Sequence, residues 1–320
     1  MIEVIVARKH REAEGIYSFE LVSADGSALP AFTPGAHVDV QMTGDGPQNL
    51  VRQYSLFNGA EAGDRYCIAV LRSLESRGGS VFMHDQVEEG TRLRISPPRN
   101  LFELAPKASS SLLFAGGIGI TPILSMARHL AATQQPFELH YCARSSAGAA
   151  FVDTLKQSPF EGSAHSYFDD LGPANQLSLG CLQAPEPGRH LYVCGPSGFM
   201  DFILNSARSA GWAEENLHRE YFAASPQPEQ VGDDFKIKIA STGAMLDVPA
   251  GKSAAQVLIE SGIDVPLSCE QGICGTCITR VLDGVPDHQD MFLTDAERAL
   301  NDRFTPCCSR SQSACLVLDL

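Results

Sequence analysis

The chain has 320 residues, enough for two or three domains, and its 44% apolar content is ordinary for a globular protein. Its formal net charge of −14 and pI near 5.0 argue against a nucleic-acid-binding surface. No apolar run approaches the roughly 18 residues of a membrane span, and the N-terminal residues lack the pattern of a signal peptide. We therefore expect a cytoplasmic protein without membrane contact, in which ten cysteines indicate a metal site before disulfides.

Residues 1–103 consist of short alternating segments separated by glycine and proline. The alternation is clearest over residues 16–22, 36–42 and 91–96. Even spacing of such segments between turns is typical of a small antiparallel β-barrel, which we predict as the first domain.

Two short motifs in this first region could bind an anion. Arg52 can pair with a phosphate through two parallel hydrogen bonds, and Tyr54 would lie on the same face of its strand. The turn Gly78-Gly79-Ser80 precedes a possible helix, whose first backbone N–H groups would be free to bind an anion. Either motif alone is more often an ordinary strand or turn.

Residues 104–226 alternate between strands and helices. An apolar strand from Ser110 runs into Gly-Gly-Ile-Gly-Ile-Thr121-Pro122, where Thr121 suits a helix N-cap and Pro122 the first helical position. Further strands are expected at residues 137–143 and 190–194, with a helix at about 150–157. This order predicts a parallel sheet that binds ligands at the carboxyl ends of its strands. An α/β domain with glycine-rich turns and no ligand is the alternative.

Four cysteines near the C-terminus have the spacing of a plant-type [2Fe–2S] site. The pattern is Cys-x4-Cys-x2-Cys, followed after 29 residues by a fourth cysteine, with Gly272 and Gly275 inside the loop. Glycine tolerates positive φ and lets backbone N–H groups approach the cluster. Zinc sites more often use paired Cys-x2-Cys spacing. The ligands are Cys269, Cys274, Cys277 and either Cys307 or Cys308, because neighbours on an extended chain face opposite sides.

These motifs together resemble the ferredoxin–NADP reductase superfamily. Their order, with the C-terminal Cys307-Cys-Ser-Arg, resembles end to end the phthalate dioxygenase reductase family, which includes vanillate O-demethylase reductases. The resemblance implies an antiparallel β-barrel flavin domain at residues 1–103, an α/β parallel-sheet nucleotide domain at 104–226, a linker at 227–234 and a β-grasp [2Fe–2S] ferredoxin domain at 235–320. It also makes Cys307 the fourth ligand.

The same resemblance assigns residues to cofactors. FMN would be held by Arg52, Gln53, Tyr54, Ser55, Ala69, Val70, Leu71, Gly78, Gly79 and Ser80. The nicotinamide nucleotide would be held by Gly117, Thr121, Gly195 and Pro196. Cys194 and Phe222 would lie along the hydride path, with Phe222 against the flavin ring. Family members can have a basic residue where Leu71 stands, so the contact on that strand departs from the pattern.

The function implied is that of a reductase component. Electrons would pass from NADH through FMN and the [2Fe–2S] cluster to a separate Rieske-type oxygenase, with the reductase acting as a monomer. The alternatives are a self-sufficient NAD(P)H:acceptor reductase and a non-enzymatic electron carrier. Arg144 and Ser145 could meet a 2′-phosphate, whereas Asp169 and Asp170 favour a free ribose, which leaves NADH and NADPH both open.

Overall fold

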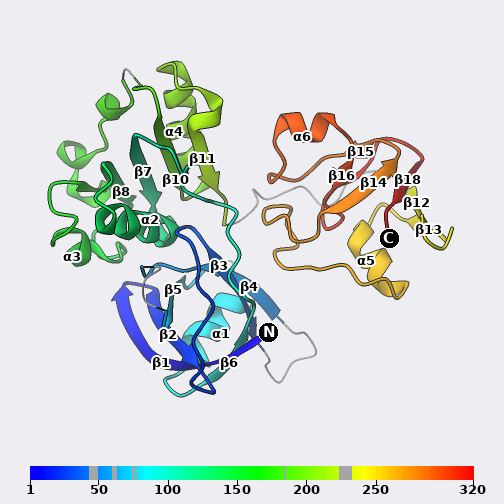
Figure 1. Ribbon diagram of the computed structural model, residues 1–320, viewed down its shortest axis with the longest axis horizontal. Helices are drawn as coiled ribbons and strands as arrows, with labels where there is room; N and C mark the ends of the chain where they lie inside the picture. Colours follow the sequence, from blue (N-terminus) through cyan, green and yellow to red (C-terminus); the bar gives the residue numbers. More distant parts are fainter. Residues whose placement is uncertain (43–49, 60–62, 74–75, 77, 184, 223–232) are drawn as a thin grey trace. The chain divides into compact units, whose positions relative to one another are not determined.

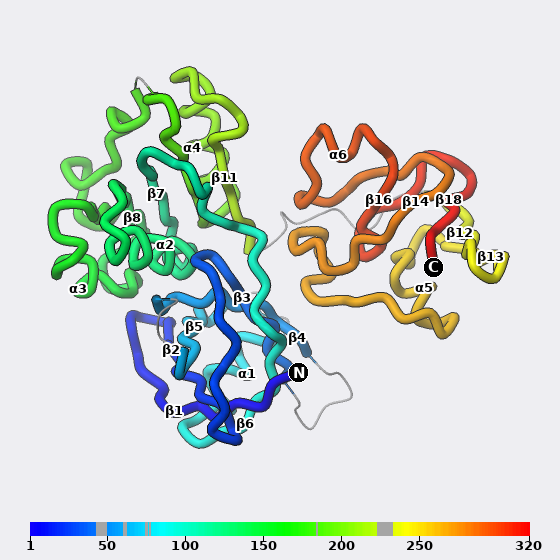
Figure 2. The backbone as a smooth tube through the Cα atoms, viewed as in Figure 1, coloured from blue at the N-terminus to red at the C-terminus, as the bar shows by residue number. Residues whose placement is uncertain are grey.

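The computed structural model describes residues 1–320 except 43–49, 60–62, 74–75, 77, 184 and 223–232. It divides into two compact units, Met1–Glu220 and Tyr221–Leu320 (Figures 1 and 2). The predicted linker at 227–234 lies outside the described residues up to residue 232. Among the residues that are described, no helix has the length and apolar character needed to cross a membrane.

The first unit begins with an antiparallel sheet of six strands in the order β4-β3-β6-β1-β2-β5. An isolated bridge between Leu56, just after β4, and Ile68 of β5 joins the two ends of this order and closes the barrel. Inward-facing residues such as Val6, Phe19 and Val40 are fully buried. The strands are β1 (Ile2–Ala13), β2 (Ile16–Ser23), β3 (His37–Met42), β4 (Leu50–Ser55), β5 (Tyr66–Leu71) and β6 (Arg92–Ile95), with helix α1 (Gly79–Asp85) against β4 and β5.

The same unit continues with a five-stranded parallel sheet in the order β11-β10-β7-β8-β9. Leu113 and Ala115 of β7 pack with helix α2, whereas Phe114 between them points to the opposite face. The strands are β7 (Ser110–Gly116), β8 (Phe137–Ala143), β9 (Ala164–Phe168), β10 (Arg189–Cys194) and β11 (Leu217–Glu220). The helices are α2 (Ile120–Ala132), α3 (Val152–Leu155) and α4 (Ser197–Ser209), with short 3₁₀ turns η1 (Gly117–Gly119), η2 (Asp169–Leu171), η3 (Pro173–Asn175), η4 (Leu179–Leu182) and η5 (Glu214–Asn216).

Two details of this sheet differ from the prediction. Helix α2 begins at Ile120 with Gly119 as its N-cap, so the expected Thr121 cap is wrong; the Thr121 hydroxyl donates instead to the Ile118 carbonyl at 3.1 Å. Its preference for capping is overridden because the 3₁₀ turn η1 leads directly into the helix. The helix expected at about 150–157 is the single turn α3.

The second unit contains a five-stranded mixed sheet in the order β13-β12-β18-β14-β16. Strands β12 and β18 are parallel, and the other pairs are antiparallel. Ser253 and Gln256 form a reciprocal capping box at the start of α5, as Thr294 and Glu297 do for α6. The elements are β12 (Phe235–Ile239), β13 (Met245–Val248), α5 (Ala254–Glu260), β14 (Thr279–Asp283), β15 (Pro286–Asp287), α6 (Asp295–Ala299), β16 (Arg303–Phe304), β17 (Arg310–Ser311) and β18 (Cys315–Leu318).

Candidate functional site

Arg52 and the Gly78-Gly79-Ser80 turn lie together at the end of the barrel. A Cβ placed on Gly79 would lie 2.6 Å from Arg52 Cγ and 3.1 Å from its Nε, so the arginine side chain crosses the first turn of α1. Gly78 has φ of 93°, a conformation that favours glycine. The Arg52 side chain and the start of α1 therefore meet where a phosphate could be bound, although the Gly78 N–H donates to the Ser76 hydroxyl at 3.2 Å and Arg52 Nη1 to the Val51 carbonyl at 2.8 Å. The Ser80 hydroxyl, by contrast, is engaged with Ser76 and with the backbone N–H of Ser73.

The other predicted flavin residues lie on β4 and β5, with adjacent side chains on opposite sides. Val70 belongs to the barrel core, whereas Ala69 joins the cluster formed with the nucleotide-binding sheet, and Leu71 is 41% exposed. Gln53 contacts the buried His37, with 3.2 Å between the side-chain nitrogens. Tyr54 packs at the margin of the barrel core. The assignment of these residues to a flavin stays a prediction.

Ser55, Cys194 and Glu220 come together from β4, β10 and β11. Cys194 pairs in register with Glu220, and both end their strands at the carboxyl edge of the parallel sheet. Burial raises the pKa of Glu220 to about 8, although its hydrogen bond with the Ser55 hydroxyl opposes the shift. Burial, and next the Glu220 carboxyl group, raise the pKa of the Cys194 thiol well above its usual value. All three side chains can thus be uncharged near neutral pH.

Glu220 is a candidate functional residue that the sequence analysis did not identify. Among the described residues its buried Oε2 atom has no hydrogen-bond partner, although the residue as a whole keeps partial exposure. A buried polar atom without a partner is costly and indicates a site that binds another group. In the sequence, only the position of Glu220 at the end of the segment Leu-His-Arg-Glu could have indicated it. That segment shows no clear alternation of apolar and polar residues.

Glycines bring the first and fourth strands of the nucleotide domain into backbone contact. A Cβ on Gly119 would lie 2.3 Å from the Cys194 carbonyl oxygen, and one on Gly195 would lie 2.9 Å from the Gly116 Cα. Gly117 has φ of 54° and open space around it. The turn at Gly117 therefore leaves open space, whereas Gly116 and Gly119 on either side of it pack against the end of β10. Pro196 follows as the N-cap of α4, so the N-terminus of this helix lies at the same edge.

A serine and an aspartate meet at the ends of β8 and β9. The backbone N–H and the hydroxyl of Ser146 donate to the Asp170 carboxylate, each at 3.1 Å. Both residues follow strands whose carboxyl ends lie at the nucleotide edge of the sheet. A carboxylate is thus fixed beside the position at which sequence analysis left the choice between NADH and NADPH open.

Four cysteines of the second unit approach one another in two pairs. Cys269 is hydrogen-bonded to Cys274, and Cys307 is hydrogen-bonded to Cys277 and to its neighbour Cys308. A [2Fe–2S] cluster takes two cysteines on each of its two irons, so these pairs fit such a cluster.

Cys307 and Cys308 lie in a turn, so the expectation of an extended chain at these residues is wrong. They lie in a turn closed by hydrogen bonds from the N–H groups of Cys308 and Ser309 to the Thr305 carbonyl. Both thiols are buried, and their sulfurs are neighbours. The Cys308 sulfur is 3.3 Å from the Thr305 hydroxyl and would lie 2.4 Å from a Cβ on Gly272. Cys307 is therefore the one that pairs with Cys277.

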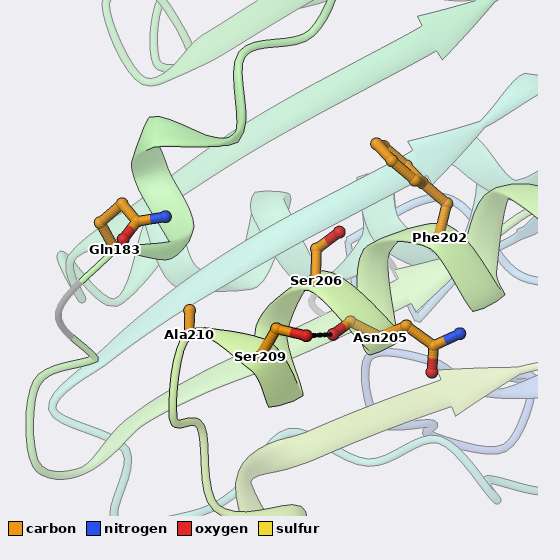
Figure 3. Close-up of a pocket in the computed structure, with 6 residues that line it drawn as sticks. All are labelled: Gln183, Phe202, Asn205, Ser206, Ser209 and Ala210. Carbon is orange, nitrogen blue, oxygen red and sulfur yellow. Dashed lines mark hydrogen bonds between the residues drawn. The ribbon is translucent and has the colours of Figure 1, made fainter.

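Phe222 lies just inside the second unit with 39% of its surface exposed, and its contact with a flavin stays a prediction. The pocket in Figure 3 contains none of the predicted residues; one wall is the outer face of α4, where the Ser209 hydroxyl donates to the Asn205 carbonyl. It is lined by Gln183, Phe202, Asn205, Ser206, Ser209 and Ala210.

Two family models match this chain. The 2Fe-2S iron-sulfur cluster binding domain matches residues 237–312, and the N-terminal domain of dimethylamine monooxygenase subunit DmmA-like proteins matches residues 91–217. The vanillate O-demethylase oxidoreductase of Pseudomonas sp. (strain HR199 / DSM 7063) is 56% identical over 321 residues, with 100% of both chains covered. The phthalate 4,5-dioxygenase oxygenase reductase subunit of Pseudomonas putida is 39% identical, with 98% of this chain and 95% of that one covered.

Among solved structures, phthalate dioxygenase reductase is 36% identical, with a TM-score of 0.75 and with 100% of this chain and 98% of that chain covered. Its title describes a modular structure for electron transfer from pyridine nucleotides to [2Fe–2S]. The chain belongs to the phthalate dioxygenase reductase family. It is an oxidoreductase that transfers electrons from NADH through a flavin and a [2Fe–2S] cluster to a separate oxygenase component. The predicted family, fold class, enzyme class, function and cofactors are confirmed.

Proposed function

We propose that this reductase serves a vanillate O-demethylase type of oxygenase, and that it acts as a cytoplasmic monomer. The proposal of vanillate as the substrate of the partner is supported by 56% and 52% identity to two vanillate O-demethylase oxidoreductases over the whole chain. One structural observation carries the electron-transfer function: the four cysteines form two sulfur pairs, the arrangement of a one-electron carrier, in the same chain as two nucleotide-binding modules.

The proposed binding roles follow the geometry. The FMN phosphate is bound by Arg52 with the N–H group of Gly79 at the start of α1, and the pyrophosphate of NADH lies against the open turn at Gly117. Gly195 and Pro196 are beside the nicotinamide at the end of β10. The cluster is held by Cys269, Cys274, Cys277 and Cys307.

The protein's contribution to the reaction is alignment and control of charge. When bound, FMN supplies the conversion between the electron pair of the nicotinamide and the single electrons of the cluster. Cys194 and Glu220 surround the transfer site with groups that burial keeps protonated near neutral pH. The Ser55 hydroxyl orients the Glu220 carboxyl group. The second oxygen of that carboxyl group has no other described partner, so it can bind the edge of a ring placed there.

We propose that Asp170 gives this reductase its preference for NADH over NADPH. Its carboxylate is held by Ser146 at the edge where the adenosine ribose of a nucleotide lies in this type of sheet. A ribose diol can donate to the carboxylate, whereas a 2′-phosphate would be repelled. Replacing Asp170 with Ala should raise kcat/KM for NADPH about tenfold, the effect of removing one repulsion of roughly 1.4 kcal/mol. An unchanged NADPH rate would contradict this role.

An anaerobic NADH titration tests the electron path. Absorbance should show bleaching of the flavin, and low-temperature electron spin resonance should show a reduced [2Fe–2S] centre. Replacing Cys274 with Ser should remove the second signal and leave the first, because each site binds its own cofactor. Bleaching without a cluster signal in the wild type would contradict the cluster assignment. Demethylation of vanillate on addition of the oxygenase component of a vanillate O-demethylase tests the choice of partner.

A further inference from the structure

We propose that helix α6 and the segment leading into it form the surface that docks the oxygenase component, through a partner patch that is apolar at its centre and basic at its rim. This α6 face consists of Met291, Phe292, Asp295, Ala296, Glu297, Ala299 and Leu300. The inference rests on the proposed function and extends it by naming the place where the partner binds.

The α6 face begins on the cluster loop itself. The backbone N–H of Met291 donates to the Gly272 carbonyl at 2.9 Å. A Cβ on Gly275 would lie 2.5 Å from the Phe292 ring, so this ring lies directly on the backbone between the ligands Cys274 and Cys277. Met291 and Phe292 are partly exposed. A partner seated here would therefore contact residues that touch the cluster loop.

The helix that follows presents a flat apolar strip to solvent. Ala296 and Ala299 are both exposed, and Leu300 at the end of the helix is 63% exposed. Two alanines and a leucine on one short helix offer close approach without long flexible side chains to order. Exposed apolar surface beside a redox centre is characteristic of a protein-binding site.

Acidic residues outnumber basic ones at this surface. Residues 282–303 contain six Asp and Glu residues and two Arg residues, Arg298 and Arg303. Arg303 lies 2.7 Å from Asp302. Arg298 donates to the Asp290 backbone carbonyl at 2.5 Å and lies 3.9 Å from its buried carboxylate, and it is 3.8 Å from Asp295. The side chain of Asp295 is fully exposed, and Glu297 lies beside it on α6. The rim of the α6 face, formed by Asp295 and Glu297, is therefore acidic and would attract a basic patch.

The opposite part of the second unit differs from the α6 face in how its charged side chains are paired. Helix α5 and strand β13 lie at a different end of the unit from α6 (Figure 1). Their carboxylates Asp247 and Glu260 are each 2.7 Å from a lysine, Lys236 and Lys252. Exposed apolar residues occur there too, but their acidic neighbours are in closer ion pairs than Asp295, which is 3.8 Å from Arg298. The two ends thus provide a test surface and a matched control on one domain.

The first test removes the charge of the rim. The double variant Asp295→Asn, Glu297→Gln keeps side-chain size, and Gln can still close the capping box with Thr294. The control variant Asp247→Asn, Glu260→Gln changes net charge equally. Vanillate demethylation is measured with the full-length reductase and increasing amounts of the oxygenase component of a vanillate O-demethylase, at low and high salt.

We expect the KM for the oxygenase to rise about tenfold at low salt in the rim variant, with kcat within a factor of about two, because rim charges act mainly on association. At about 0.3 M salt the difference should shrink, since charges at the surface are then screened. The control variant should match the wild type. Reduction of the flavin and the cluster by NADH, followed by stopped flow, should be unchanged in both variants.

A second variant tests the apolar strip without altering charge. Ala299→Gln adds bulk to the middle of the α6 face and keeps helix propensity. Its KM for the oxygenase should also rise, at both salt concentrations. Equal KM values in the rim variant, Ala299→Gln, the control and the wild type would overturn the proposal. Slower reduction of the cluster by NADH in the rim variant would also overturn it, since the face would then serve electron entry. A wild-type protein that takes up electrons from NADH but never reduces the oxygenase would overturn the proposed function instead.

Discussion

Replacing Glu220 with Gln should change how the stability of the first unit depends on pH. Burial raises the pKa of this carboxyl group to about 8 from an ordinary value of 4.5. A carboxyl group whose pKa is raised on folding destabilises the folded protein as pH rises, because the unfolded chain releases the proton first. Gln imitates the protonated form and does not titrate. The variant should therefore gain stability relative to the wild type as pH increases.

The size of the effect follows from the two pKa values. Between pH 5.5 and 8.0 the wild type should lose about 3 kcal/mol relative to Glu220→Gln, at 1.36 kcal/mol for each pH unit over which only the unfolded state is ionised. Glu220 keeps part of its surface exposed, so solvent screening reduces this difference, and about 3 kcal/mol is its upper limit. Burial lowers the pKa values of His37 and His218 to about 4, which destabilises the folded state in the opposite direction, as pH falls. Both histidines are present in both proteins, so their contributions cancel in the difference.

Urea unfolding followed by the fluorescence of Trp212 measures this difference. Trp212 is the single tryptophan of the chain, is 5% exposed and lies in the same unit as Glu220, where its indole N–H donates to the Leu182 carbonyl. Both proteins are measured with the same saturating concentration of FMN, so that cofactor release on unfolding is matched. A difference in the free energy of unfolding that stays constant within about 0.5 kcal/mol from pH 5.5 to 8.0 would refute the reasoning.

Four further substitutions test three sites one at a time. Cys308→Ser should keep the visible absorbance of the cluster and Cys307→Ser should lose it; the reverse result would make Cys308 the ligand. Gly119→Ala should cost about 3 kcal/mol or more in Trp212-monitored unfolding, because its Cβ would lie 2.3 Å from a backbone oxygen, and a neutral effect would contradict the tight packing. Arg310→Met should cost the ferredoxin unit about 3 kcal/mol, since the guanidinium donates to three backbone carbonyls. Loss of cluster absorbance at the same temperature as in the wild type would count against that role.

The parts of the fold that sequence predicts best are those fixed by covalent spacing and backbone conformation. The cysteine spacing requires a loop that folds back within nine residues, and Gly272 and Gly275 have the positive φ values that this loop predicts, 72° and 64°. Strand alternation likewise locates the barrel strands, because one side of each strand is buried. These are local rules, so a single sequence is sufficient to apply them.

The parts that sequence does not predict depend on contacts between distant segments. Glu220 gains its role only because β11 pairs with β10 and the barrel supplies Ser55. Cys307 and Cys308 form a turn set by hydrogen bonds to Thr305, which no alternation pattern indicates. The one-turn helix α6 is too short to show a periodic signal.

Negative charge is suppressed at the sheet edge of the first unit, whereas carboxyl groups are exposed on α6 of the second unit. The direction of electron transfer gives a reason for this difference. A unit charge 4 Å from an electron acceptor would oppose reduction by about 4 kcal/mol at an effective dielectric constant of 20. The first unit avoids this cost at the edge of its parallel sheet, because burial keeps Glu220 and Cys194 protonated near neutral pH. The second unit exposes Asp295 on α6, away from any such enclosure. The proposed hydride-transfer site would thus face a neutral Glu220 carboxyl group, while the exposed Asp295 side chain is available to a basic partner.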